Sequence, residues 1–104
     1  MSDDAPTPPP RYTAAEPPEI LYHSVAADEL DDVLARGIVP TGRPHVHLAR
    51  RPEHARSAIR EESRPVMLEV RALELHRAGG RFFVSPKGTW LTDAVPSRYF
   101  SVME

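Results

Sequence analysis

Residues 79–102 read GGRFFVSPKGTWLTDAVPSRYFSV, and this stretch decides the fold class. Short runs of aromatic and β-branched residues alternate there with turn residues, which predicts strands over Phe82–Ser85, Thr89–Thr92 and Arg98–Val102. Pro86-Lys87-Gly88 marks the turn between the first two strands. Helices are therefore expected mostly in the first two-thirds of the chain. Strands this short, in that arrangement, favour a small α+β domain built on a split or mixed sheet.

The chain before residue 79 alternates between strand and helix patterns. Leu30, Val33 and Leu34 recur at helical spacing, and Gly37 is the expected stop of that helix. The predicted order from Ile20 onward is β-α-β-α-β-α-β-β-β. The remaining predicted elements are strands over Ile20–His23, His45–Ala49 and Pro65–Val70, and helices over Asp28–Arg36, Pro52–Glu62 and Arg71–Ala78.

The first residues differ in composition from the rest. Six of the 12 prolines in this 104-residue chain fall within residues 1–20, and aliphatic side chains are few there. Such a stretch buries too little apolar surface to offset the entropy of ordering, so residues 1–19 are expected to be a disordered arm. Residues 20–104 suffice for one domain and are too few for two.

Several classes of protein are excluded or disfavoured. The chain has no cysteine, so it holds no disulfide, no cysteine-type zinc site and no thiol nucleophile. No apolar run approaches the roughly 20 residues that span a membrane. The acidic, proline-rich start is unlike a signal peptide, so a cytoplasmic protein is expected. No glycine-rich nucleotide-binding loop is present.

The charges are unevenly distributed around a formal net charge of −2. Between Arg43 and Arg81 there are nine arginines and five acidic residues, and Lys87 is the chain's one lysine. Arginine gives planar, bidentate recognition of phosphate, which a lysine does not. A general bias toward arginine is the alternative explanation of the total, but it does not explain individual positions.

Histidines are the other candidate functional residues. His45 and His47 lie two apart on a predicted strand, so their side chains share one face. No third ligand follows at a suitable spacing, and we expect no metal site. Taken alone, His23 is a half-buried histidine bonded to backbone, and Trp90 is most simply a core residue.

Four segments stand out by their order and spacing: ILYHSV (20–25), GIVPTGRPHVHLA (37–49), PVMLEV (65–70) and GGRFFVSPKGTWLTDAVPSRYF (79–100). Together they resemble the C-terminal lobe of the RNA 2′-phosphotransferase (KptA) family. The family segments read approximately LYHGT, GLxPMxRxHVHLS, PVVLEV and GxxFYxSxNGVWLTxxVPPxY. The resemblance implies the fold of the ADP-ribosyltransferases, in which a split β-sheet pair holds NAD in a cleft.

The resemblance also implies roles for individual residues. Arg43 matches an arginine that the family uses on phosphate, and His47 matches the second motif histidine; these two are the candidate catalytic residues. His23 matches the histidine that holds the nicotinamide-side ribose. The candidate cofactor-binding residues are His23, Ser24, Ser85, Gly88, Thr89 and Trp90.

The reaction implied by the resemblance has two steps and uses NAD as a co-substrate. The 2′-phosphate of an RNA, such as a tRNA, attacks C1″ of the nicotinamide ribose and expels nicotinamide. The ribose 2″-OH then attacks phosphorus, which frees the RNA and a cyclic phosphate of ADP-ribose. Because nicotinamide leaves as a neutral group, the protein needs phosphate-binding groups and placement more than acid–base catalysis.

Some features depart from the family pattern. The winged-helix-like N-terminal lobe of complete members is expected to be missing. Ser24 stands where the family has glycine, so its side chain is expected to crowd the pocket, and Lys87 replaces an asparagine. The transferase that the resemblance implies either acts on 2′-phosphorylated RNA or passes ADP-ribose to another acceptor, and two alternatives to an enzyme stay open as well. One is a non-catalytic module that binds NAD, ADP-ribose or a phosphorylated RNA end, and the other is a subunit that depends on a separate protein resembling the missing lobe.

Overall fold

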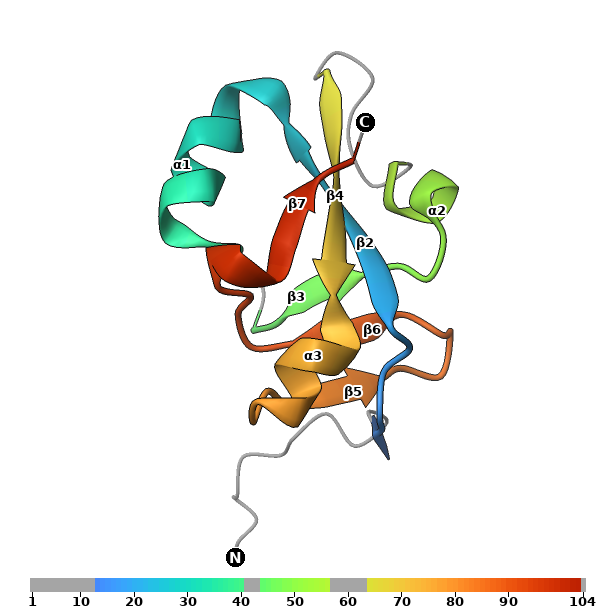
Figure 1. Ribbon diagram of the computed structural model, residues 1–104. Coiled ribbons are helices and arrows are strands. Elements are labelled where there is room, and N and C mark those ends of the chain that lie inside the picture. The colour runs from blue at the N-terminus through green and yellow to red at the C-terminus, as the bar shows by residue number, and fades with distance from the viewer. Residues whose placement is uncertain (1–12, 41–43, 57–63, 104) are drawn as a thin grey trace, which may run out of the picture.

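The computed structural model describes residues 13–40, 44–56 and 64–103 (Figure 1). The strands are β1 (Thr13–Ala14), β2 (Ile20–Ala26), β3 (Val46–Leu48), β4 (Pro65–Arg71), β5 (Phe82–Val84), β6 (Trp90–Thr92) and β7 (Phe100–Val102). The helices are α1 (Leu30–Arg36), α2 (Pro52–Arg56) and α3 (Ala72–Arg77), with 3-10 turns η2 (Ala27–Glu29) and η3 (Ser97–Tyr99).

The strands form two separate sheets. One sheet has the order β1-β5-β6-β3 and the other the order β2-β4-β7. In Figure 1 the two sheets run in different directions, and α1 and α2 flank the three-stranded sheet. This arrangement confirms the α+β class. Every strand pairing among the described residues is antiparallel, so the sheets are split but not mixed.

From Ile20 onward, the order of strands and helices agrees with the prediction. β2 runs to Ala26, beyond the predicted end at His23, because all seven of its residues pair with β4. The last residues of the helix predicted over Pro52–Glu62 lie outside the described part of the chain. Among the described residues, no helix has both the length and the apolar character needed to cross a membrane.

Residues 13–19 correct the expectation of a disordered arm over residues 1–19. Thr13 pairs with Val84 and Ala14 with Phe83, so β1 is an edge strand beside β5. The Ala15 N–H donates to the Phe82 carbonyl at 3.1 Å. Backbone pairing orders this stretch, and it does not require the aliphatic side chains whose scarcity suggested disorder. Residues 1–12 of the expected arm lie outside the described residues.

One hydrophobic core connects the two sheets. Leu21 of β2 and Leu68 of β4 have no exposed surface, and they cluster with Leu48 of β3 and Phe82 of β5. Trp90 belongs to the same cluster and is only 8% exposed, which confirms that it is a core residue. Because the cluster draws on both sheets, their packing is set by the same side chains that stabilise the fold.

Gly37 ends α1, as predicted, and turns the chain toward its next contact. Its φ of 87° lies in the region that favours glycine. An added Cβ would lie 2.6 Å from the Val95 carbonyl oxygen, which is too close for any side chain. Ile38 then forms an antiparallel bridge with Val95 through two backbone hydrogen bonds of 2.9 and 2.8 Å.

The core gives a first prediction. Replacing Leu68 with alanine removes a fully buried side chain from the central strand of its sheet. We expect the free energy of unfolding to fall by about 2–5 kcal/mol, measured by urea denaturation. Leu34→Ala is the matched control, because Leu34 is 43% exposed and should change stability by less than about 1 kcal/mol. Equal losses in the two variants would contradict this assignment of the core.

Candidate functional site

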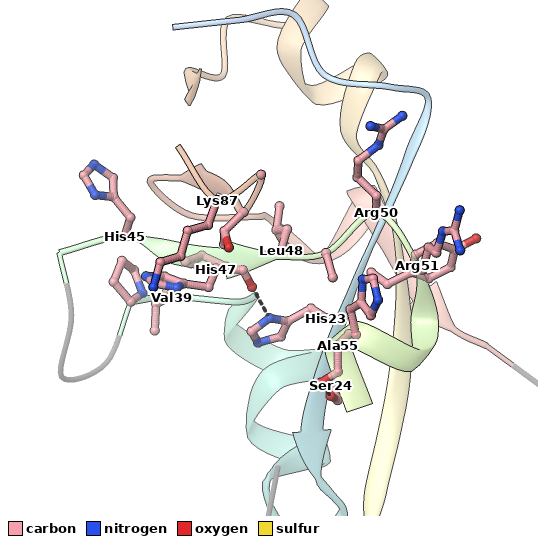
Figure 2. A pocket seen from close by; sticks show the side chains of 17 residues that line it. His23, Ser24, Val39, His45, His47, Leu48, Arg50, Arg51, Ala55 and Lys87 are labelled. Carbon is pink, nitrogen blue, oxygen red and sulfur yellow. Dashed lines mark hydrogen bonds between the residues drawn. The ribbon is translucent and has the colours of Figure 1, made fainter. Parts of the chain in front are cut away.

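A cleft of about 990 Å³ opens where β2 and β3 meet (Figure 2). It is walled by these two strands, the start of α2, the Val39-Pro40 segment after α1, and the turn between β5 and β6. Of the residues predicted for the site, His23, Ser24, His47, Gly88 and Thr89 line this cleft. The fold therefore brings together residues from the first, second and last of the resembling segments.

A backbone bridge holds β2 against the end of β3. The Tyr22 N–H donates to the Ala49 carbonyl at 2.8 Å, and the Ala49 N–H donates to the Tyr22 carbonyl at 2.9 Å. This bridge links the two sheets and places His23 beside β3. Nδ1 of the His23 ring then lies 2.9 Å from the carbonyl oxygen of His47. The prediction of a histidine bonded to backbone is confirmed.

The hydrogen bond fixes which nitrogen of His23 carries the proton. A carbonyl oxygen only accepts, so Nδ1 is the donor and Nε2 of the neutral ring keeps its lone pair. Burial lowers the pKa of His23 below its ordinary value of 6.5, and the bond to the His47 carbonyl only partly opposes that effect. His23 is therefore a neutral imidazole at pH 7, and Nε2 can accept a hydrogen bond from a hydroxyl group.

Strand alternation turns His47 toward the cleft. Val46 and Leu48, its neighbours on β3, are 3% and 2% exposed and pack in the core, whereas His47 is half-buried on the opposite face. His45, two residues earlier, also lines the cleft. Its ring meets the Phe83 ring edge-on, with centroids 5.8 Å apart. The predicted shared face of the two histidines is confirmed.

Ser24 is held against α2. Its side-chain oxygen donates to the Ala55 carbonyl at 2.5 Å, and the residue is 7% exposed. In Figure 2 the Ser24 side chain lies beside Ala55, away from the ring of His23. The hydroxyl that was expected to crowd the pocket therefore has an anchor on the adjoining helix.

The turn between β5 and β6 presents Lys87, Gly88 and Thr89 to the cleft. Ser85 fixes its shape, because the Ser85 hydroxyl oxygen accepts from the backbone N–H groups of Lys87 at 3.3 Å and Thr89 at 3.2 Å. Gly88 has a φ of 89°, which the turn requires.

Ser85 and Trp90, two predicted cofactor-binding residues, do not line this cleft. The hydroxyl of Ser85 faces its own turn, and Trp90 packs in the core. Arg43, the predicted phosphate-binding residue, lies outside the described residues.

The described lining of the cleft is cationic. It includes Arg50, Arg51 and Lys87 and contains no aspartate or glutamate. None of these three cations forms an ion pair with another described residue. A cleft with this lining suits an anionic ligand such as a phosphate.

Arg50, Arg51 and His54 were not singled out from the sequence, although an Arg-Arg pair just before a helix-starting proline is visible there. This Arg-Arg pair is not part of a recognisable motif. Within the described residues, no group of three or more histidines and carboxylates is placed to hold a metal ion.

Comparison with known proteins shows which family this chain matches. Residues 4–94 match the family described as "RNA 2'-phosphotransferase, Tpt1 / KptA family". A protein of Burkholderia lata named "Probable RNA 2'-phosphotransferase" is 45% identical over 94 residues, which cover 90% of this chain and 48% of the relative. A relative of the same name from Pseudomonas aeruginosa is 43% identical over 85% of this chain and 48% of its own length. Another from Streptomyces griseus is 45% identical over 82% of this chain and 45% of its own length. The chain thus spans about half the length of the curated relatives it matches.

The lowered pKa of His23 predicts a pH dependence of stability. Below pH 6.5 the unfolded chain binds a proton at this residue that the folded chain resists, so stability falls as the pH drops below 6.5 and is fully present above it. Urea denaturation of the wild type and His23→Gln from about pH 7.5 to about pH 5.5 should show the wild type losing more stability in acid. A stability difference that stays constant over this range would contradict the buried neutral state.

The Ser24 hydroxyl predicts a specific loss on truncation. Ser24→Ala removes the buried hydrogen bond to the Ala55 carbonyl, so the free energy of unfolding should fall by about 1 kcal/mol. Ser101→Ala, on the exposed edge of β7, is the matched control and should stay within about 0.5 kcal/mol of the wild type. Thermal or urea denaturation measures both, and an unchanged Ser24→Ala protein would show that the hydroxyl does not anchor α2.

Proposed function

This chain belongs to the RNA 2′-phosphotransferase family, Tpt1/KptA, and from that premise we propose that it transfers the 2′-phosphate of an RNA to NAD, with release of nicotinamide. One observation carries the proposal beyond the family. Among the described residues, the cleft that gathers His23 and His47 is lined by three cations and by no carboxylate. Both substrates of such a reaction bring phosphate groups to the site.

The described residues fit NAD in size and charge. A volume of about 990 Å³ lies at the upper end of the usual range for ligand sites. The pyrophosphate of NAD is anionic, and Lys87 lines the cleft as a cation without an ion-pair partner among the described residues. The two split sheets with a cleft at their junction also support the proposal of an ADP-ribosyltransferase-like arrangement.

The proposal gives each residue a limited task. His23 accepts a hydrogen bond from a ribose hydroxyl through Nε2, since Nδ1 is committed to the His47 carbonyl. His47 and Thr89 wall the reacting end from β3 and from the turn before β6. Arg43, through the family resemblance, binds the attacking phosphate bidentately. Together they orient the reacting groups and stabilise developing charge rather than move protons.

The lining of the cleft is consistent with these roles of the residues. When bound, NAD supplies a leaving group, nicotinamide, that departs uncharged, so no strong general acid is needed beside it. A carboxylate facing the phosphate of the RNA would repel it, and the described lining contains none. The cationic groups are therefore the part of the site on which the proposed chemistry depends most.

The test follows both products. The purified chain is incubated with NAD and a 2′-phosphorylated oligonucleotide, and nicotinamide and the cyclic phosphate of ADP-ribose are measured by chromatography. We expect both products from the wild type and a loss of about 100-fold or more in Arg43→Ala and His47→Ala. Arg77→Ala, an exposed change on α3, is the control and should retain the activity.

The other outcomes separate the alternatives. Calorimetric binding of NAD or the RNA end without either product would assign the chain to a non-catalytic binding module. Products that form only after a separate protein resembling the N-terminal lobe of the family is added would assign it to a partner-dependent subunit. Full activity in Arg43→Ala would refute the phosphate-binding role of that residue.

A further inference from the structure

Arg50 and Arg51 lie at the open rim of the cleft. The proposed chemistry does not say which phosphate either arginine binds. Both residues line the cleft and both are exposed. In Figure 2 they lie on one side of His23, and Lys87 lies on the other side. The cationic groups of the described site therefore stand at two ends, with the neutral imidazole of His23 between them.

The segment that carries the two arginines is fixed at both ends. Before it, Ala49 is tied to Tyr22 by the two backbone hydrogen bonds of the bridge. After it, the Arg51 carbonyl accepts from the N–H groups of His54 at 3.1 Å and Ala55 at 3.3 Å, which opens α2. The backbone beneath the guanidinium groups is thus held in place by the same contacts that build the cleft.

The two guanidinium groups do not converge. Figure 2 shows the side chains of Arg50 and Arg51 extending in different directions from adjacent positions of the chain. Groups that converge can bind one phosphate from two sides, whereas groups that diverge reach separate phosphates. A ligand that matches them carries more than one anionic group along its length.

The charge around the rim favours the same ligand. Neither arginine forms an ion pair with a described residue, and no described carboxylate lines the cleft. Two adjacent cations without a counter-charge repel each other, and a polyanion that reaches both relieves that repulsion. Single-stranded nucleic acid, with a phosphate at every nucleotide, has this distribution of charge.

We propose that Arg50 and Arg51 bind backbone phosphates of the RNA on one side of the reacting nucleotide. The inference rests on the proposed function and names its acceptor more closely: an oligonucleotide with phosphates flanking the reacting one, rather than a mononucleotide. The two arginines are then specificity-determining residues that act on the RNA strand and leave the handling of NAD to the rest of the cleft.

The experiment measures RNA binding in the absence of NAD. Fluorescence anisotropy follows a 2′-phosphorylated oligonucleotide and the corresponding dinucleotide over a range of salt concentrations. The double variant Arg50→Gln/Arg51→Gln is compared with Arg64→Gln/Arg77→Gln, which removes the same charge from exposed positions outside the cleft. Each phosphate contact to a single strand contributes about 0.7 to the slope of log affinity against log salt.

The expected result is selective for the longer ligand. Arg50→Gln/Arg51→Gln should weaken oligonucleotide binding at least about tenfold and lower the salt slope by about 1.4, with a much smaller effect on the dinucleotide. The control double variant should stay close to the wild type. An unchanged slope, equal losses in the control, or an equal loss with the dinucleotide would each overturn the assignment. Equal displacement of the RNA by an acidic peptide of the same charge would overturn it as well.

The outcome is independent of catalysis. If the wild type releases no nicotinamide but binds the oligonucleotide with a slope that depends on Arg50 and Arg51, the proposed function fails and this inference stands. If nicotinamide is released with a dinucleotide acceptor and the two double variants bind RNA alike, the proposed function stands and this inference fails.

Discussion

The site depends on the backbone bridge between Tyr22 and Ala49. Its two hydrogen bonds, 2.8 and 2.9 Å long, join β2 of one sheet to the residue that follows β3 of the other sheet. Each bond contributes only about 0.5–1.5 kcal/mol net to stability, so the importance of the bridge is geometric rather than energetic. It brings His23 to the His47 carbonyl and sets the start of α2 against β2. The cleft, the tautomer of His23 and the position of the arginine rim all follow from this one contact.

Much of the fold was predictable because its signals are local. Periodic apolar residues and turn residues gave the order of elements from Ile20, and Gly37 ended α1 where its backbone freedom is required. β1 was missed because Thr13 and Ala14 are ordered by the edge of β5, a strand some 70 residues away in the sequence. Sequence patterns within a two-residue strand cannot show which distant edge it will meet.

The site was predictable only in part, for a related reason. Resemblance selected segments that meet at the cleft, but it could not say which side chain of each segment faces the cleft. Ser85 shapes its turn and Trp90 packs in the core, whereas their neighbours Lys87, Gly88 and Thr89 line the cleft. A role for Arg50 and Arg51 could be inferred only from the structure, in which the bridge places them beside His23. The net charge of −2 likewise gave no sign of a cationic cleft, because it averages over the whole surface.

The short strand β1 has a consequence for anyone who trims this chain. It covers the edge of β5, whose residues Phe82–Val84 are largely apolar and would otherwise offer open backbone groups. Uncovered, flat, apolar edges are templates for pairing between molecules. Pro17 and Pro18, shortly after β1, cannot extend a ladder, since a proline has no N–H to donate. Deletion of residues 1–15 would thus uncover this edge and favour self-association through β5.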